Sequence, residues 1–214
     1  MSSVGQLTPT PRLLLGPGPS DAHPRVLSAM STPLLGHLDP EFLTIMDETQ
    51  ELLRATFQTK NPLTFPVSAT GMAGMEACLV NLLEPGDSAL ICVSGFFGQR
   101  LVEIATRCGA TVTILDRPWG EVFALDQISE GIEKAKPKVV AIVQAETSTG
   151  AWQSLDGLGK LCHDNDALLV FDAVTALGCV PVDVDKNEID AVYSCSQKGL
   201  GCPSGMAPVS FSPR

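Results

Sequence analysis

A lysine among small residues follows a short apolar run late in the chain. Lys198 stands in the segment 196–199, Ser-Gln-Lys-Gly, just after the run Ala191–Ser194. Lysine ordinarily occupies solvated surface. An amine that is partly desolvated has a lowered pKa and becomes nucleophilic, as Schiff-base chemistry requires. The sequence therefore offers a candidate nucleophile, with an ordinary surface-loop lysine as the alternative interpretation.

A carboxylate follows a second apolar run. Asp172 comes directly after Leu168–Phe171. A carboxylate in that position can ligate a metal, act as a base or pair with a protonated ring nitrogen, and helix capping is the alternative. The histidines, His23, His37 and His163, are scattered along the chain, so no cluster with metal-ligand spacing accompanies Asp172. We therefore expect no metal site.

Glycines and small residues fill residues 68–76, between a third apolar run and a predicted helix. Free backbone N–H groups at the first turn of a helix bind a phosphate through hydrogen bonds and the helix dipole. The alternative is an ordinary N-cap made by Ser68 or Thr70. The segment is not a P-loop, because it lacks the Gly-Lys-Ser/Thr ending.

The three features together predict more than each does alone. Pyridoxal phosphate needs its phosphate anchored, its pyridine nitrogen kept protonated and its aldehyde held as an imine. An anion site, a carboxylate and a nucleophilic lysine at three separate strand ends meet those needs. The combination therefore predicts a pyridoxal 5'-phosphate site.

These residues must be positioned by an α/β domain, since short apolar runs alternate with helical segments. Near-continuous apolar runs are typical of strands buried on both faces of a mostly parallel sheet. The predicted strands are Leu63–Val67, Ala89–Val93, Thr111–Leu115, Val139–Val143, Leu168–Phe171, Ala191–Ser194 and Ala207–Phe211. The predicted helices are Glu41–Phe57, Gly71–Leu83, Gly98–Cys108, Leu125–Lys134 and Leu155–His163. In such sheets ligands bind beyond the carboxyl ends of the strands, which is where the three features lie.

Composition excludes several other classes of protein. The chain carries 14 Lys+Arg against 24 Asp+Glu, a net charge of −10, which argues against nucleic-acid binding. Its apolar runs are far shorter than the ~18 residues of a membrane span. Seven cysteines without a CxxC pair indicate neither a disulfide scaffold nor a zinc site. The first 11 residues lack the apolar core of a secretory signal, so we expect a soluble, intracellular protein.

Residues 13–211 resemble the class V aminotransferases of fold type I, most closely the alanine–glyoxylate (serine–pyruvate) group. The resemblance rests on seven motifs in the family's order and spacing. They are Leu15–Ser20, Phe57–Leu63, Leu83–Ser88, Gly98–Arg100, Glu146–Gly150, Leu155–Gly157 and Tyr193–Lys198. The resemblance implies a fold type I large domain whose mostly parallel sheet has seven strands with flanking helices.

The resemblance also implies roles for individual residues. Lys198 matches the Schiff-base lysine, and Asp172 matches the carboxylate that pairs with the pyridine nitrogen. The other matched cofactor contacts are Thr70, Gly71 and Met72 in the phosphate cradle, Gln197 beside the phosphate, Phe97 and Val174 on the two faces of the ring, and Thr147 near the phenolic oxygen. Core packing is the alternative for Phe97 and Val174, and a loop hydrogen bond for Thr147.

The chain departs from the family pattern at three residues and in length. Met72 replaces a polar side chain, Phe97 replaces the usual Trp, and Cys195 replaces a typical Gly. Family members are nearly twice as long as this chain. We therefore expect an N-terminal arm over residues 1–20 and a cofactor-binding large domain over residues 21–214. The small domain, with its substrate-carboxylate arginine, is expected to be absent from these residues.

The resemblance implies transfer of an amino group from alanine or serine to glyoxylate or pyruvate. It further implies a homodimer in the full-length form and a location in the peroxisome or mitochondrion. Two alternatives stay open: another class V enzyme, such as a lyase or desulfurase, and a catalytically inactive truncated isoform. Residues 1–214 alone are expected to turn over negligibly, because positioning by the missing arginine supplies several kcal/mol of rate acceleration.

Overall fold

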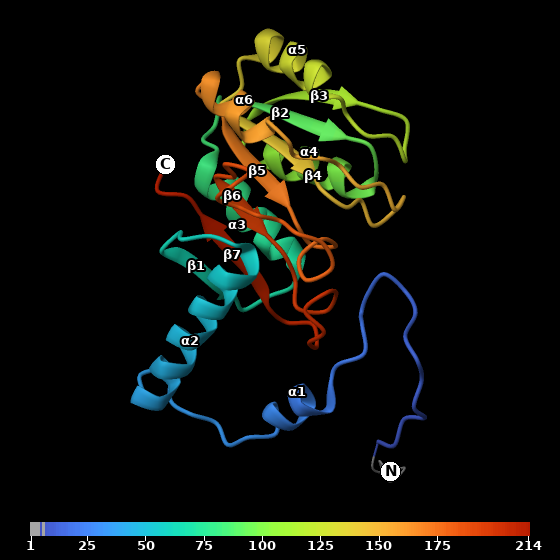
Figure 1. Cartoon of the computed structure of the whole chain (residues 1–214), viewed down its shortest axis with the longest axis vertical. Helices are drawn as coiled ribbons and strands as arrows, with labels where there is room; N and C mark the ends of the chain where they lie inside the picture. Colours follow the sequence, from blue (N-terminus) through green and yellow to red (C-terminus); the bar gives the residue numbers. More distant parts are fainter. Residues whose placement is uncertain (1–4, 6) are drawn as a thin grey trace.

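A computed structural model describes residue 5 and residues 7–214 of the chain. Its strands are β1 (Leu63–Val67), β2 (Ser88–Val93), β3 (Thr111–Asp116), β4 (Val139–Val143), β5 (Leu168–Asp172), β6 (Ala191–Tyr193) and β7 (Ala207–Phe211). Its helices are α1 (Pro24–Ala29), α2 (Pro40–Phe57), α3 (Gly71–Leu82), α4 (Phe96–Arg107), α5 (Leu125–Ala135) and α6 (Leu158–Asp164). The alternation of strands and helices confirms the predicted α/β class (Figure 1).

The seven strands form one sheet in the order β1-β7-β6-β5-β4-β2-β3. Strands β3, β2, β4, β5 and β6 pair in parallel, whereas β7 runs antiparallel to both of its neighbours, β6 and β1. All strands except β7 therefore point their carboxyl ends toward the same edge of the sheet. This arrangement confirms the prediction of a mostly parallel sheet.

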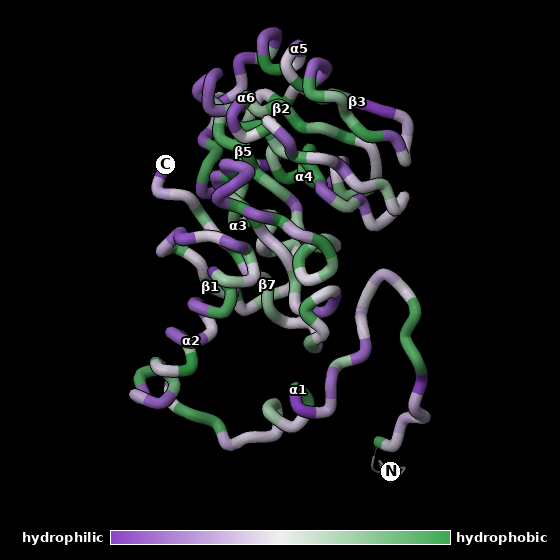
Figure 2. The backbone as a smooth tube through the Cα atoms, in the orientation of Figure 1, coloured by the Kyte–Doolittle hydropathy of each residue, from purple (hydrophilic) through white to green (hydrophobic). Residues whose placement is uncertain are grey.

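Two hydrophobic clusters cover the two faces of the sheet, because successive side chains of a strand point to opposite faces. On one face α3 and α4 pack on side chains such as Ile91 and Ala141. On the other, α5, α6 and the C-terminal end of α2 pack on side chains such as Leu90 and Val140. Figure 2 shows the hydrophobic residues concentrated along the central strands. Burial on both faces explains why the strands are apolar runs without polar alternation.

Most predicted boundaries agree with the structure to within one residue. The exceptions are the starts of two helices and the unpredicted α1. Helix α4 begins at Phe96 instead of Gly98, because a buried carboxylate accepts hydrogen bonds from its first turn. Helix α6 begins at Leu158 instead of Leu155, after Gly157 with a φ of 77°. Helix α1 has only six residues, too few for a hydrophobic period to show.

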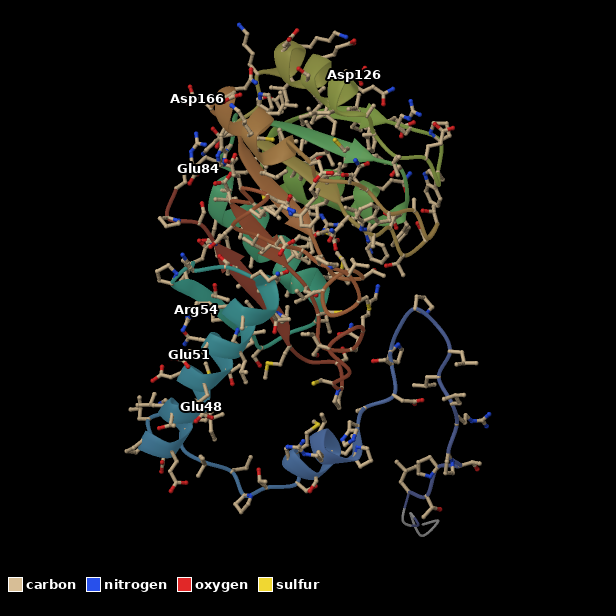
Figure 3. All side chains as sticks on the ribbon, in the orientation of Figure 1. Glu48, Glu51, Arg54, Glu84, Asp126 and Asp166 are labelled. Carbon is tan, nitrogen blue, oxygen red and sulfur yellow. The ribbon has the colours of Figure 1, made fainter. Side chains whose placement is uncertain are left out.

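Helix α1 and the first turns of α2 lie away from the sheet (Figure 1). Helix α2 buries only Leu53 and Phe57 near its C-terminal end, and its labelled charged side chains, Glu48, Glu51 and Arg54, project outward (Figure 3). The predicted arm over residues 1–20 includes residues 1–4 and 6, which lie outside the described part of the chain. Across the described residues, no helix is both long and apolar enough to cross a membrane.

Candidate active site

The carboxyl ends of β1, β5 and β6 meet around a cavity of about 140 Å³. The residues that line it come from α3 and its N-cap, from the first turn of α4, and from the last residues of β5 and β6 and the segments that follow them. They are Thr70, Gly71, Met72, Met75, Phe97, Asp172, Val174, Tyr193, Gln197 and Lys198. The structure thus brings together eight of the nine site residues predicted from the sequence, and the ninth, Thr147, contacts Lys198 directly.

The amine of Lys198 reaches two hydroxyl groups from neighbouring loops. Its Nζ donates hydrogen bonds to Thr147 Oγ1 at 2.7 Å and to Thr175 Oγ1 at 2.9 Å. Burial lowers the pKa of this half-buried amine, while the negative charges around it oppose that change. The lowered pKa raises the fraction of neutral, nucleophilic amine above that of a surface lysine. Lys198 therefore lies half-buried in the cavity wall, held by two hydroxyl groups, and is not a freely solvated lysine.

Thr175 is a site residue that sequence reasoning missed. It lies three residues after Asp172, and its hydroxyl contacts that of Thr147 as well as Lys198 Nζ. The two threonines follow β5 and β4, which are adjacent and parallel, so their loops lie side by side.

The N-terminal segment anchors the lysine loop from the other side. The backbone N–H of Ser20 donates a hydrogen bond to the carbonyl oxygen of Gln197 at 2.9 Å. The hydroxyl of Ser20 donates a second one to the carbonyl oxygen of Lys198 at 2.8 Å. Gly18 has a φ of +139°, and a Cβ there would lie 2.9 Å from Lys198 Cγ. A side chain at residue 18 would therefore displace the lysine.

Asp172 is a buried carboxylate at the end of β5, with 2% of its surface exposed. Its Oδ2 accepts a hydrogen bond from Tyr193 Oη at 2.7 Å, and its Oδ1 accepts one from the backbone N–H of Val174 at 2.8 Å. Burial raises the pKa of Asp172 to about 6, although both hydrogen bonds favour the charged form. At neutral pH the cavity thus contains a carboxylate that can pair with a cation.

Tyr193 was not predicted as a site residue. It pairs in register with Asp172 on the neighbouring strand and is fully buried. Burial raises the pKa of its hydroxyl well above the usual value, so it stays protonated and donates to the carboxylate. Among the described residues, no group of three or more His, Cys, Asp or Glu side chains is arranged to hold a metal ion.

The first turn of α3 fits a phosphate. Thr70 is the N-cap residue, but its side chain makes no capping hydrogen bond, so the alternative of an ordinary Thr70 cap is wrong. Within the described chain, the backbone N–H groups of Gly71 and Met72 have no acceptor. The amide oxygen Oε1 of Gln197 is also buried without a partner. The two free N–H groups meet the requirement for an anion at a helix N-terminus, whereas Gln197 would contact an anion only through its amide N–H groups.

Gly71 packs against the residues that follow β5 and β6. A Cβ at this position would lie 3.0 Å from Cys195 Cβ and 3.5 Å from Val174 Cγ2. Cys195 is buried, and its Sγ lies 3.8 Å from the carbonyl oxygen of Val174. The Cys195 side chain thus occupies space next to the backbone of α3, where only a glycine can approach closely.

Phe97 forms an aromatic wall of the cavity. The centroid of its ring lies 5.6 Å from Lys198 Nζ and 5.3 Å from the centroid of Phe96, which packs edge-on against it. Val174 lies between Asp172 and Thr175 and also lines the cavity. These side chains provide apolar surface for a flat ring, next to a carboxylate and an amine.

Comparisons with known proteins agree with this geometry. A family model for class-V aminotransferases matches residues 13–213. Alanine–glyoxylate aminotransferase of Mus musculus is 47% identical over 201 residues, 94% of this chain and 49% of that protein. (S)-Ureidoglycine–glyoxylate transaminase of Bacillus subtilis is 46% identical over 214 residues, the whole of this chain and 51% of that protein. The chain therefore spans about half the length of these curated relatives.

Solved structures give the same result for the fold. A crystal structure of alanine–glyoxylate aminotransferase from Nostoc sp. has a TM-score of 0.97 and 53% identity, covering 99% of this chain and 56% of that one. Ureidoglycine–glyoxylate aminotransferase from Bacillus subtilis follows with a TM-score of 0.96, covering 97% of this chain and 54% of that one. The class V enzymes depend on pyridoxal phosphate. By its matched residues, its fold and the layout of its cavity, this chain belongs to the class-V aminotransferase family.

Proposed function

We propose that the chain binds pyridoxal phosphate in this cavity and forms the cofactor-binding half of an aminotransferase. The observation that carries the proposal is the convergence of a partly desolvated lysine, a buried carboxylate and unsatisfied helix amides on one cavity. In this proposal residues 21–214 are the cofactor-binding large domain, and residues 1–20 are an N-terminal arm whose Ser20 secures the lysine loop.

Each part of the cofactor has residues that fit it. The N–H groups of Gly71 and Met72, the Thr70 hydroxyl and the Gln197 amide would hold the phosphate. The Asp172 carboxylate would pair with the protonated ring nitrogen. The remaining proposed contacts are with Phe97 and Val174 for the faces of the ring, and with Thr147 for its phenolic oxygen.

When bound, pyridoxal phosphate supplies an aldehyde that reacts with amines and a ring that accepts electrons. Lys198 Nζ, with its lowered pKa, would bind the aldehyde carbon and later take the proton from Cα of the amino acid. The hydroxyls of Thr147 and Thr175 would hold this amine in place when it is free. Asp172 would keep its negative charge beside the ring nitrogen, where Tyr193 fixes its orientation.

The substrates we propose are alanine or serine as amino donor and glyoxylate or pyruvate as acceptor. Support comes from the mouse and Nostoc proteins, both of which are named alanine–glyoxylate aminotransferase. This chain matches about half the length of each. The Bacillus protein is named for ureidoglycine, which makes that amine a third donor to test. We also propose a homodimer for the full-length form and a peroxisomal or mitochondrial location, as the family resemblance implies.

A second candidate is another class V enzyme, a lyase or a desulfurase. A cysteine desulfurase from Thermococcus onnurineus shares the fold with a TM-score of 0.66 at 18% identity, and that likeness concerns the fold alone. A desulfurase would release sulfur from cysteine, whereas an aminotransferase would form a 2-oxo acid. The reaction products therefore distinguish a desulfurase from an aminotransferase. A protein that forms neither product would support the alternative of a catalytically inactive isoform.

The test of amino transfer compares residues 1–214 with a chain extended over the full length of its relatives. Both are loaded with pyridoxal phosphate and mixed with L-alanine and glyoxylate, and pyruvate and glycine are measured. We expect the extended chain to form both products and residues 1–214 to form almost none, because substrate positioning supplies several kcal/mol. An extended chain that forms neither product from any amino donor would contradict the proposed activity.

A separate prediction concerns the affinity of the proposed phosphate site for the cofactor. Replacing Thr70 with alanine removes one hydroxyl from the cradle, and we expect cofactor affinity to fall by about 1–2 kcal/mol, roughly 5- to 30-fold. The dissociation constants of pyridoxal phosphate and of pyridoxal are measured by absorbance titration. Thr44→Ala, on the surface of α2, is the control. If Thr70→Ala weakened pyridoxal as much as pyridoxal phosphate, the phosphate would lie elsewhere.

A further inference from the structure

Glu146 has a buried carboxylate, and it is not among the cofactor contacts or catalytic groups proposed above. Only 3% of its surface is exposed, and none of the described basic side chains forms a salt bridge with it. Burial of a carboxylate without a cation is costly unless hydrogen bonds satisfy its oxygens. The groups that donate hydrogen bonds to the Glu146 carboxylate therefore identify the segments that its charge holds in place.

Its two oxygens bind two different segments. Oε2 accepts hydrogen bonds from the backbone N–H groups of Phe97, at 3.1 Å, and Gly98, at 3.4 Å, in the first turn of α4. Oε1 accepts from the backbone N–H of Ser148 at 3.1 Å and from its hydroxyl at 2.7 Å. The carboxylate thus joins the start of α4 to the loop after β4.

The Glu146 side chain and the backbone before α4 are in close contact. A Cβ on Gly95, the residue before α4, would lie 2.2 Å from Glu146 Cγ and 2.4 Å from its Cδ. The Glu146 side chain therefore packs directly on the backbone that leads into α4. A shorter or displaced side chain would free the Phe97 and Gly98 N–H groups. Ser148, which Glu146 also holds, caps the Phe96 N–H of the same turn through its hydroxyl at 3.0 Å.

Both segments contribute groups to the cavity around Lys198. Phe97, whose N–H is bound by Glu146, places its ring centroid 5.6 Å from Lys198 Nζ. Thr147, the residue after Glu146, places its hydroxyl 2.7 Å from the same nitrogen. One carboxylate therefore sets where an aromatic wall and a hydroxyl stand relative to the amine.

We propose that Glu146 is a positioning residue, whose buried carboxylate fixes the Phe97 wall relative to Thr147 and Lys198. The inference rests on the proposed function, because the place of the Phe97 ring matters for binding only if a cofactor ring lies against it. A carboxylate that merely stabilised the fold would affect binding in the same proportion whether or not Phe97 kept its ring.

A double-mutant cycle on the dissociation constant of pyridoxal phosphate tests this coupling. Glu146→Asp keeps the charge but is one methylene too short to reach α4. We expect it to raise the dissociation constant about tenfold in the otherwise unchanged protein, and less than about threefold in a Phe97→Leu background. Combined with Thr70→Ala, Glu146→Asp should keep its full effect, since Thr70, the N-cap of α3, shares no hydrogen bond with Glu146.

Equal effects of Glu146→Asp in all three backgrounds would overturn the inference. If this variant does not fold, Glu146→Gln of equal length takes its place in the cycle. Borohydride labelling of Lys198 in the unchanged protein comes first. Absence of that label contradicts the proposed function itself, whereas a label together with an additive cycle contradicts only the role of Glu146.

Discussion

Replacing Lys198 with alanine is expected to abolish covalent retention of pyridoxal phosphate. Among the residues that the structure describes, no other lysine lines the cavity, and the hydroxyls of Thr147 and Thr175 cannot form an imine with an aldehyde. The variant should still bind the cofactor reversibly through the phosphate and ring contacts. Removal of the Cα proton should slow by about 10⁴-fold or more, because nucleophile and base are lost together.

The measurement is the amount of cofactor that stays with the protein after denaturation and dialysis, with and without prior borohydride reduction. Lys186→Ala, on the exposed surface, is the matched control and should retain the cofactor as the unchanged protein does. Thermal unfolding should show that both variants are folded. Retention by the Lys198→Ala variant equal to that of the control would mean that another lysine binds the aldehyde.

Replacing Asp172 with asparagine is expected to leave the fold intact and to impair cofactor binding and chemistry severely. Asparagine can accept a hydrogen bond from the Val174 N–H through Oδ1 and donate one to Tyr193 Oη through Nδ2, but it carries no charge for a protonated ring nitrogen. Loss of one charge-assisted hydrogen bond should weaken binding about 10- to 100-fold. Loss of a preorganised charge should slow Cα proton removal about 10²- to 10³-fold.

The pH dependence of binding gives an independent check on Asp172. Burial raises its pKa to about 6, so the carboxylate is charged above that pH and becomes neutral below it. Cofactor affinity should therefore fall as the pH drops through about 6, and Asp172→Asn should lack this step. Asp47→Asn, on exposed α2, should keep it. Near-normal affinity and proton removal in the Asp172→Asn variant would contradict the proposed role.

The sequence predicted most of the sheet because each strand is a compact apolar run with clear boundaries. The run Val139–Val143, for example, is buried along its whole length between two layers of helices. Helix starts were harder to predict when distant groups determine them. Phe96 begins α4 because Glu146 and Ser148, about 50 residues later in the chain, bind its first N–H groups.

The site was predicted where chemistry and strand ends coincide, as at Asp172 and Lys198. The residues that were missed act through others: Thr175 on the lysine amine and Tyr193 on the carboxylate. Their side chains are an ordinary threonine and an ordinary buried tyrosine in the sequence. Only the pairing of neighbouring strands brings them to their partners, so local patterns could not reveal them.

The central claim is that Lys198 is the residue that holds the cofactor. Its most direct test is borohydride reduction of the unchanged, cofactor-loaded protein, followed by proteolysis and mass mapping of the labelled peptide. We predict one pyridoxyl group per chain, on the peptide that contains Ser196, Gln197 and Lys198. A label on any other lysine, or no label at saturating pyridoxal phosphate, would contradict the assignment of this cavity as the cofactor site.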